Sequence, residues 1–118
     1  MTTTISSIVI DCADPVALAG FYAKATGWQV ADADPDYASV TGGPVQLSFQ
    51  RIEGYQGPGW PDGGAKHLHL DLTVPDVEEA RKALVALGAT VPDPQPGGDE
   101  WTVVLDPEGH PFCVMAAG

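Results

Sequence analysis

The clearest pattern along the chain is the strict alternation of polar and apolar residues from His67 to Val74. A period of two is typical of a β-strand, in which successive side chains point to opposite faces of a sheet. One face of this strand would carry leucines and a valine, and the other would carry His67, His69, Asp71 and Thr73. Two imidazoles on one face make it a candidate binding surface, although an exposed sheet face is also polar when it has no function.

The first half of the chain predicts a strand, a helix and three further strands. Residues 5–12 alternate as a strand, and Asp14 followed by Pro15 predicts the start of a helix that ends at Gly27. Turn-forming residues at 32–36 and 42–44 separate the later strands. These strands are expected at residues 28–31, 37–41 and 45–50.

The second half predicts the same order of elements. A strand at residues 69–74 precedes a capping box of Asp76 and Glu79, which predicts a helix that ends at Gly88. The remaining strands are expected at residues 89–91, 101–105 and 111–115.

An internal repeat relates the two halves. A shift of 62 residues places Ser7 on His69 and Asp14 on Asp76, which indicates two copies of one supersecondary unit. We therefore expect a single α+β domain of two tandem βαβββ units. Each unit would leave one sheet face open, so the first strands should pair and form a curved mixed sheet around a shared cleft. The expected parts are unit 1–52, a Gly- and Pro-rich connector 53–66 and unit 67–118.

The composition of the 118-residue chain excludes several partners. Sixteen acidic and five basic residues give a formal net charge of −11, which repels nucleic acid and anionic lipid and attracts cationic ligands. No apolar run is long enough to span a membrane, and no secretory signal is recognisable. Cys12 and Cys113 lie in apolar runs typical of buried, reduced thiols. We therefore expect a cytoplasmic protein that binds neither nucleic acid nor membrane.

Four motifs stand out along the chain: Ile10-Asp11-Cys12-Ala13-Asp14-Pro15, Gly27-Trp28, the strand that begins at His69, and Asp106-Pro107-Glu108-Gly109. Together they resemble the vicinal oxygen chelate superfamily. This superfamily includes glyoxalase I, bleomycin-resistance proteins, fosfomycin-modifying enzymes, extradiol dioxygenases and methylmalonyl-CoA epimerase. The resemblance covers essentially the whole chain and implies the fold of that superfamily. It does not imply one activity, because the superfamily performs many chemistries on one scaffold.

The resemblance also implies where a metal would bind. Metal-dependent members hold a divalent ion on side chains from the first and last strands of each unit, usually histidine or glutamine and glutamate. The corresponding positions are Ser7, Gln46, His69 and Cys113. Of these four residues, only His69 matches the usual ligands well. A hard ion such as Mg²⁺ needs anionic oxygen ligands, which this set lacks. His69 and Cys113 could bind Zn²⁺, but the third ligand would have to be Ser7 or Gln46. We therefore expect no metal and no other cofactor, with a divalent ion as the alternative.

The other candidate ligand-binding residues are mostly aromatic. Phe49, Trp60 and Trp101 would supply the walls of a small-molecule pocket, with Tyr55 and His110 nearby. His67 precedes the aligned position His69 by two residues. Core packing is the alternative for each aromatic residue. The chain lacks a Walker loop, a dinucleotide fingerprint and a nucleophile elbow.

Three functions remain open from the sequence. The first is binding of a small molecule in a metal-free cleft, such as sequestration of an antibiotic or a metabolite. The alternative is a metal-dependent lyase, isomerase or dioxygenase acting on a small oxygenated metabolite, with His69 as metal ligand or general base. The third is a structural or regulatory dimer. The sequence does not decide whether the protein is an enzyme. We also expect a homodimer, because exposed strand edges are commonly covered by pairing.

Overall fold

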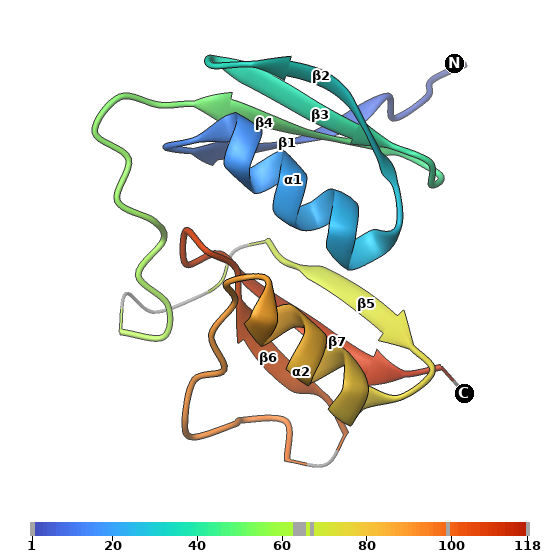
Figure 1. The fold of residues 1–118 in the computed structure, drawn as a ribbon, viewed down its shortest axis with the longest axis vertical. Helices are drawn as coiled ribbons and strands as arrows, with labels where there is room; N and C mark the ends of the chain where they lie inside the picture. Colours follow the sequence, from blue (N-terminus) through green and yellow to red (C-terminus); the bar gives the residue numbers. More distant parts are fainter. Residues whose placement is uncertain (1, 63–65, 67, 99, 118) are drawn as a thin grey trace. The chain divides into compact units, whose positions relative to one another are not determined.

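The structure is a computed structural model of the chain. It describes all residues except 1, 63–65, 67, 99 and 118 (Figure 1). The chain divides into two compact units, Met1–Gln56 and Gly57–Gly118. Each unit combines one helix with one sheet, so the expected α+β class is confirmed.

The first unit is a four-stranded mixed sheet with one helix (Figure 1). The spatial order of its strands is β1-β4-β3-β2; β1 is parallel to β4, and the other neighbours are antiparallel. Because β1 and β4 pair, Ser7 lies opposite Gln46. The elements are β1 (Ser7–Cys12), α1 (Pro15–Thr26), β2 (Gln29–Asp34), β3 (Tyr37–Thr41) and β4 (Gln46–Arg51).

Helix α1 begins and ends where the sequence predicted. The side chain of Asp14 caps its first turn, where Oδ1 accepts a hydrogen bond from the backbone N of Ala17 at 3.2 Å. Pro15 occupies the first helical position. Gly27 follows the last turn with a φ of 80°, a left-handed conformation that glycine adopts without steric cost.

The core of the first unit forms between α1 and the sheet. The ring of Tyr22 stacks on the ring of Phe49 with centroids 5.5 Å apart, and Phe21 meets Tyr22 edge-on at 5.0 Å. Phe49 is 0% exposed. The core-packing alternative therefore holds for Phe49, which the sequence had placed among the ligand-binding residues.

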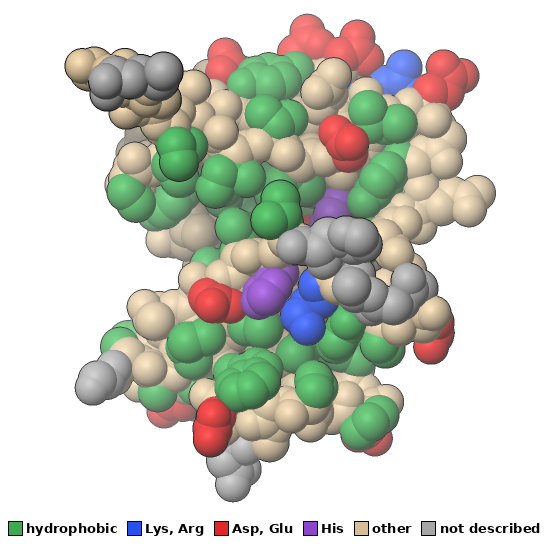
Figure 2. Space-filling model, turned by 180° about the vertical axis from the view of Figure 1, so that it is seen from behind, with side chains coloured by type: hydrophobic (Ala, Val, Ile, Leu, Met, Phe, Trp, Pro, Cys, Tyr) green, Lys and Arg blue, Asp and Glu red, His purple; other side chains and the backbone are tan. Residues whose placement is uncertain are grey.

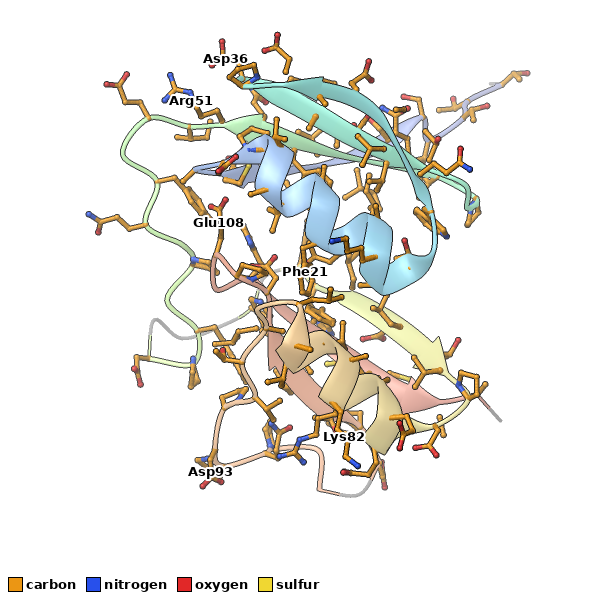
Figure 3. The ribbon with its side chains drawn as sticks, viewed as in Figure 1. Phe21, Asp36, Arg51, Lys82, Asp93 and Glu108 are labelled. Carbon is orange, nitrogen blue, oxygen red and sulfur yellow. The ribbon has the colours of Figure 1, made fainter. Side chains whose placement is uncertain are left out.

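The hairpin between β2 and β3 is tighter than the sequence predicted. Strand β2 continues to Asp34, whose Oδ1 accepts a hydrogen bond from the backbone N of Asp36 at 2.9 Å, so the turn occupies only residues 35–36. Asp36 also receives a hydrogen bond of 3.0 Å from Arg51 Nε at the end of β4 (Figure 3). This exposed ion pair ties the hairpin to the neighbouring strand.

The second unit is a three-stranded sheet with one helix. The spatial order is β5-β7-β6; β5 is parallel to β7, and β6 is antiparallel to it. Asp76 caps the helix by accepting a hydrogen bond from the backbone N of Glu79 at 3.1 Å, as the capping-box pattern predicted. The elements are β5 (Leu70–Val74), α2 (Val77–Ala86), β6 (Thr102–Leu105) and β7 (Pro111–Ala116).

The prediction of a strand at residues 89–91 is wrong. The structure has a single bridge there, in which Thr90 and Leu105 exchange backbone hydrogen bonds of 2.9 and 2.8 Å. Prolines at positions 92, 94 and 96 follow it. They lack the backbone N–H groups that a longer strand would need.

The side chain of Gln95 takes the place of that missing strand. Its Oε1 accepts a hydrogen bond from the backbone N of Val103 at 2.7 Å, and its Nε2 donates to the backbone O of Val103 at 2.9 Å. The same Nε2 donates to the backbone O of Pro92 at 2.7 Å. One side-chain amide thus satisfies both backbone groups at the edge of β6.

The hydrogen bonds of the described residues form two sheets, one in each unit. Each first strand pairs with the last strand of its own unit, β1 with β4 and β5 with β7. Pairing between the two first strands stays a prediction. Cys12 and Cys113 are buried thiols, as predicted. In the described part of the chain, no helix has the length and apolar character needed to cross a membrane.

Replacing Gln95 by alanine tests the edge cap. The change removes the hydrogen bonds to Val103 and Pro92 and leaves half-buried backbone groups unsatisfied. We expect the free energy of unfolding to fall by about 1–3 kcal/mol in urea titrations. Gln56→Ala, at an exposed position, is the control and should change the free energy by less than about 0.5 kcal/mol. Equal effects of the two substitutions would contradict the role given to Gln95.

Candidate functional site

The candidate site lies on one face of the second sheet. The parallel pairing of β5 with β7 places Asp71 opposite Cys113. Side chains alternate along each strand, so Met115 shares the face of Cys113, whereas Phe112 and Val114 lie on the other face. Phe112 and Val114 are 0% and 1% exposed and belong to the core of this unit.

A pocket of about 310 Å³ opens at this face. Its volume lies at the small end of the range for ligand pockets. Figure 2 shows a histidine side chain at the surface with acidic and basic side chains beside it and apolar side chains around them. All of the lining residues belong to the second unit: Lys66, His69, Asp71, Trp101, Cys113 and Met115.

Trp101 forms the aromatic wall of the pocket, and its indole packs against Gly97. A Cβ atom at position 97 would lie only 2.4 Å from Cε2 of the Trp101 indole. Gly97 is buried, so the ring packs directly against its backbone. The indole can lie this close to the backbone because position 97 carries no side chain.

Three side chains at the pocket bring together nitrogen, oxygen and sulfur donors. His69 Nε2 lies 3.3 Å from Asp71 Oδ1. The potential ligand atoms of His69, Asp71 and Cys113 all lie within 4.8 Å of one another. The sequence predicts His69 and Cys113 at the site but gives no signal for Asp71 as a further ligand, because only the strand register sets Asp71 opposite Cys113.

This donor set fits one class of metal ion. A histidine nitrogen, a carboxylate oxygen and a cysteine sulfur are the ligands of borderline ions such as Zn²⁺. A hard ion such as Mg²⁺ prefers several oxygen ligands, and Asp71 is the single carboxylate among the pocket residues. The third ligand that sequence analysis sought at Ser7 or Gln46 is thus available within the second unit as Asp71.

The Cys113 thiol is held in its neutral form. Burial raises the pKa of Cys113 most, and the negative charge of Asp71 and a hydrogen bond to its carboxylate raise it further. The ammonium group of Lys66 acts in the opposite direction and lowers the pKa. A thiol with a raised pKa is a weak nucleophile at neutral pH, so Cys113 keeps its proton and donates it to the Asp71 carboxylate.

Lys66 and Trp60 form a pair beside the pocket. Lys66 Nζ lies 4.6 Å from the centroid of the Trp60 ring, within the range of a cation–π interaction. Trp60 therefore orders the lysine, whereas Lys66 itself lines the pocket. The polar–apolar alternation that predicts the strand with the histidines does not identify Lys66 as a pocket residue. Lys66 precedes that strand, in a Gly- and Pro-rich segment.

The positions predicted in the first unit form a separate polar cluster. Gln46 Nε2 donates hydrogen bonds to Ser48 Oγ at 3.0 Å and to Tyr37 Oη at 3.3 Å, and Tyr37 Oη donates to Ser48 Oγ at 2.7 Å. Ser7 lies opposite Gln46 on the neighbouring strand. The structure thus sets Ser7 opposite Gln46 in the first unit and brings His69 close to Cys113 in the second. The convergence of all four stays a prediction.

Two other histidines were singled out in the sequence. His67 lies outside the described residues. His110 supports the turn between β6 and β7, where its Nδ1 lies 2.8 Å from Oδ2 of the buried Asp106 carboxylate. Oδ1 of Asp106 also accepts a hydrogen bond from the backbone N of Glu108 at 2.8 Å. These contacts give His110 a structural role in the turn.

The protonation state of Cys113 can be tested by its reactivity. In a Cys12→Ala background, Asp71→Asn should lower the pKa of Cys113, because the substitution removes the charge that opposes the thiolate. Alkylation by iodoacetamide should then become faster at a fixed pH, and its pH profile should move to lower pH. Asp93→Asn, at an exposed position, is the control. Identical profiles for the two variants would rule out the proposed effect of Asp71 on the thiol.

Comparisons with known proteins agree with this architecture. The family model for the glyoxalase-like domain matches residues 7–115. None of the curated proteins compared with the chain matches it.

Several solved structures share the fold. A glyoxalase/bleomycin resistance protein/dioxygenase family enzyme from Burkholderia phytofirmans PsJN has a TM-score of 0.74 and 22% identity, with 97% of this chain and 98% of that chain covered. A possible glyoxalase from Bacillus cereus has a TM-score of 0.69 and 19% identity over 97% and 99%. The bleomycin-binding protein from Streptomyces verticillus, complexed with copper(II)-bleomycin, has a TM-score of 0.61 and 18% identity, with full coverage of both chains (100%). The resemblance to the vicinal oxygen chelate superfamily is thus confirmed, and the chain belongs to the glyoxalase-like domain family.

Proposed function

We propose that the protein binds a small organic molecule in the pocket of the second unit and that this binding needs no metal ion. The observation that carries the proposal is the composition of the pocket. An indole ring, a thioether and a small number of polar groups line a pocket of about 310 Å³. Ligand sites typically combine apolar walls with a few polar groups that orient the ligand.

The polar groups offer complementary hydrogen bonds. Lys66 supplies a donor and Asp71 supplies acceptors, while the neutral Cys113 thiol donates to the Asp71 carboxylate. His69 can donate from one ring nitrogen and accept at the other. A ligand with both donors and acceptors would therefore be oriented in the pocket without a metal.

The structural neighbours support binding of a small molecule. The bleomycin-binding protein from Streptomyces verticillus is complexed with copper(II)-bleomycin. Sequestration of an antibiotic or a metabolite is the corresponding function for this chain. Because this neighbour is 18% identical to the chain, it supports only the statement that this fold can bind a small molecule.

A second candidate function is a metal-dependent enzyme, and the donor set favours it. His69, Asp71 and Cys113 would hold a Zn²⁺-like ion, which would supply a Lewis acid for a ligand oxygen. In this alternative Lys66 and Trp101 would bind and orient the substrate. Metal binding would also need the Cys113 proton to leave, so it would weaken at low pH.

Metal analysis and thermal shifts distinguish the two functions. For the metal-free site, purified protein should contain well under one equivalent of metal, and EDTA should leave its melting temperature unchanged. His69→Ala should then leave the thermal response to Zn²⁺ unchanged and weaken the response to aromatic fragments, since ligand binding to the native state raises the melting temperature. Glu78→Ala, on the exposed side of α2, is the control for both readouts. A full equivalent of tightly held metal that His69→Ala removes would establish the second function.

The homodimer expected from the sequence also remains a proposal. Near the start of the chain, the apolar residues Ile5, Ile8 and Val9 are 75%, 37% and 50% exposed. Pairing with a second copy would cover them. Light scattering at tens of micromolar protein should give the mass of two chains, and a strictly monomeric mass would contradict the dimer.

A further inference from the structure

Lys66 stands out among the basic residues because it lines a pocket instead of pairing with a carboxylate. In the described part of the chain, no carboxylate oxygen lies within 4.0 Å of Lys66 Nζ. The chain has five basic residues and a net charge of −11, and Lys66 is the one basic residue among those that line the pocket. Three other basic residues make ion pairs: Arg51–Asp36 at 3.0 Å, Arg81–Glu78 at 3.7 Å and Lys82–Glu79 at 3.9 Å.

The contact with Trp60 holds the ammonium group without neutralising it. A cation–π interaction attracts the charge to the ring face but supplies no negative ion. The ammonium group also belongs to the pocket, since Lys66 is one of its lining residues. The pocket therefore contains an oriented positive charge that lacks an anionic partner among the described residues.

The other pocket residues limit which further chemical groups an anionic ligand can carry. The Trp101 indole, fixed on Gly97, offers a surface for an aromatic ring. Asp71, which Lys66 does not reach, accepts hydrogen bonds from donor groups such as a hydroxyl. A volume of about 310 Å³ suits a molecule with a single ring.

We propose that the pocket binds a small hydroxylated aromatic acid whose carboxylate pairs with Lys66 and whose ring lies against Trp101. This inference rests on the small-molecule function proposed above and narrows its ligand class. The overall negative charge of the chain favours cations at long range, but salt screens that field within about 8–10 Å. Inside the pocket, the direct contact with Lys66 is charge-assisted and acts at hydrogen-bond distance.

Two matched probes test the charge of the ligand. Para-hydroxybenzoate carries a carboxylate, and para-hydroxybenzamide has nearly the same shape without the charge. Each is titrated into ¹⁵N-labelled full-length protein, and the shifts of the Trp101 indole and of the backbone amides of Asp71 and Cys113 report on the pocket. We expect the carboxylate to bind at least about fivefold more tightly than the amide, with the preference falling at high salt.

Three variants assign the preference to Lys66. Lys66→Met keeps the length of the side chain and removes its charge, so the two probes should then bind within about twofold of each other. Lys66→Arg should retain the preference for the carboxylate, because a guanidinium also pairs with carboxylates. Lys24→Met, near the end of α1 in the first unit, changes the net charge equally and should leave the preference intact.

The outcomes separate this inference from the proposed function. Equal binding of both probes at the pocket amides, or a preference that survives Lys66→Met, would overturn the inference and leave small-molecule binding supported. Tighter binding of para-hydroxybenzylamine than of the carboxylate would also overturn it and would indicate a cationic ligand on Asp71. If no probe of any charge and no member of an aromatic fragment set shifts these resonances, both proposals fail.

Discussion

The parallel pairing between the first and the last strand of each unit is the constraint on which the candidate site depends. In the second unit it sets Asp71 opposite Cys113, and in the first unit it sets Ser7 opposite Gln46. Parallel strands need a long crossover connection, so residues far apart in the sequence meet in one row. A slip of one residue would turn each side chain to the opposite face and would remove the carboxylate from the pocket.

The segment that covers the free edge of β6 also builds the pocket wall. Gln95 binds both backbone groups of Val103 and so fixes a segment that forms no strand of its own. Two residues later, Gly97 provides the flat surface on which Trp101 packs. Protection of a sheet edge and placement of the aromatic ligand wall are therefore two results of one short connection.

Electrostatics at the pocket differ from those of the whole chain. The net charge of −11 predicts attraction of cations, yet the pocket presents Lys66 without a paired carboxylate among the described residues. The same pocket keeps Cys113 protonated, because burial and the nearby Asp71 both oppose the thiolate. Short-range contacts between a few groups, rather than the summed charge, thus decide the chemistry that the site offers.

The local patterns in the sequence were enough to predict the elements and the family. Alternation, the caps at Asp14 and Asp76 and the terminal glycine at position 27 depend on neighbouring residues, and both helices begin where these signals predicted. The strand expected at residues 89–91 failed because its existence depends on a partner for its hydrogen bonds. The burial of Phe49 and the roles of Asp71 and Lys66 likewise depend on which strands pair and on where a loop side chain lies. A period of two shows that residues share a face, but only tertiary packing decides whether that face becomes core or pocket.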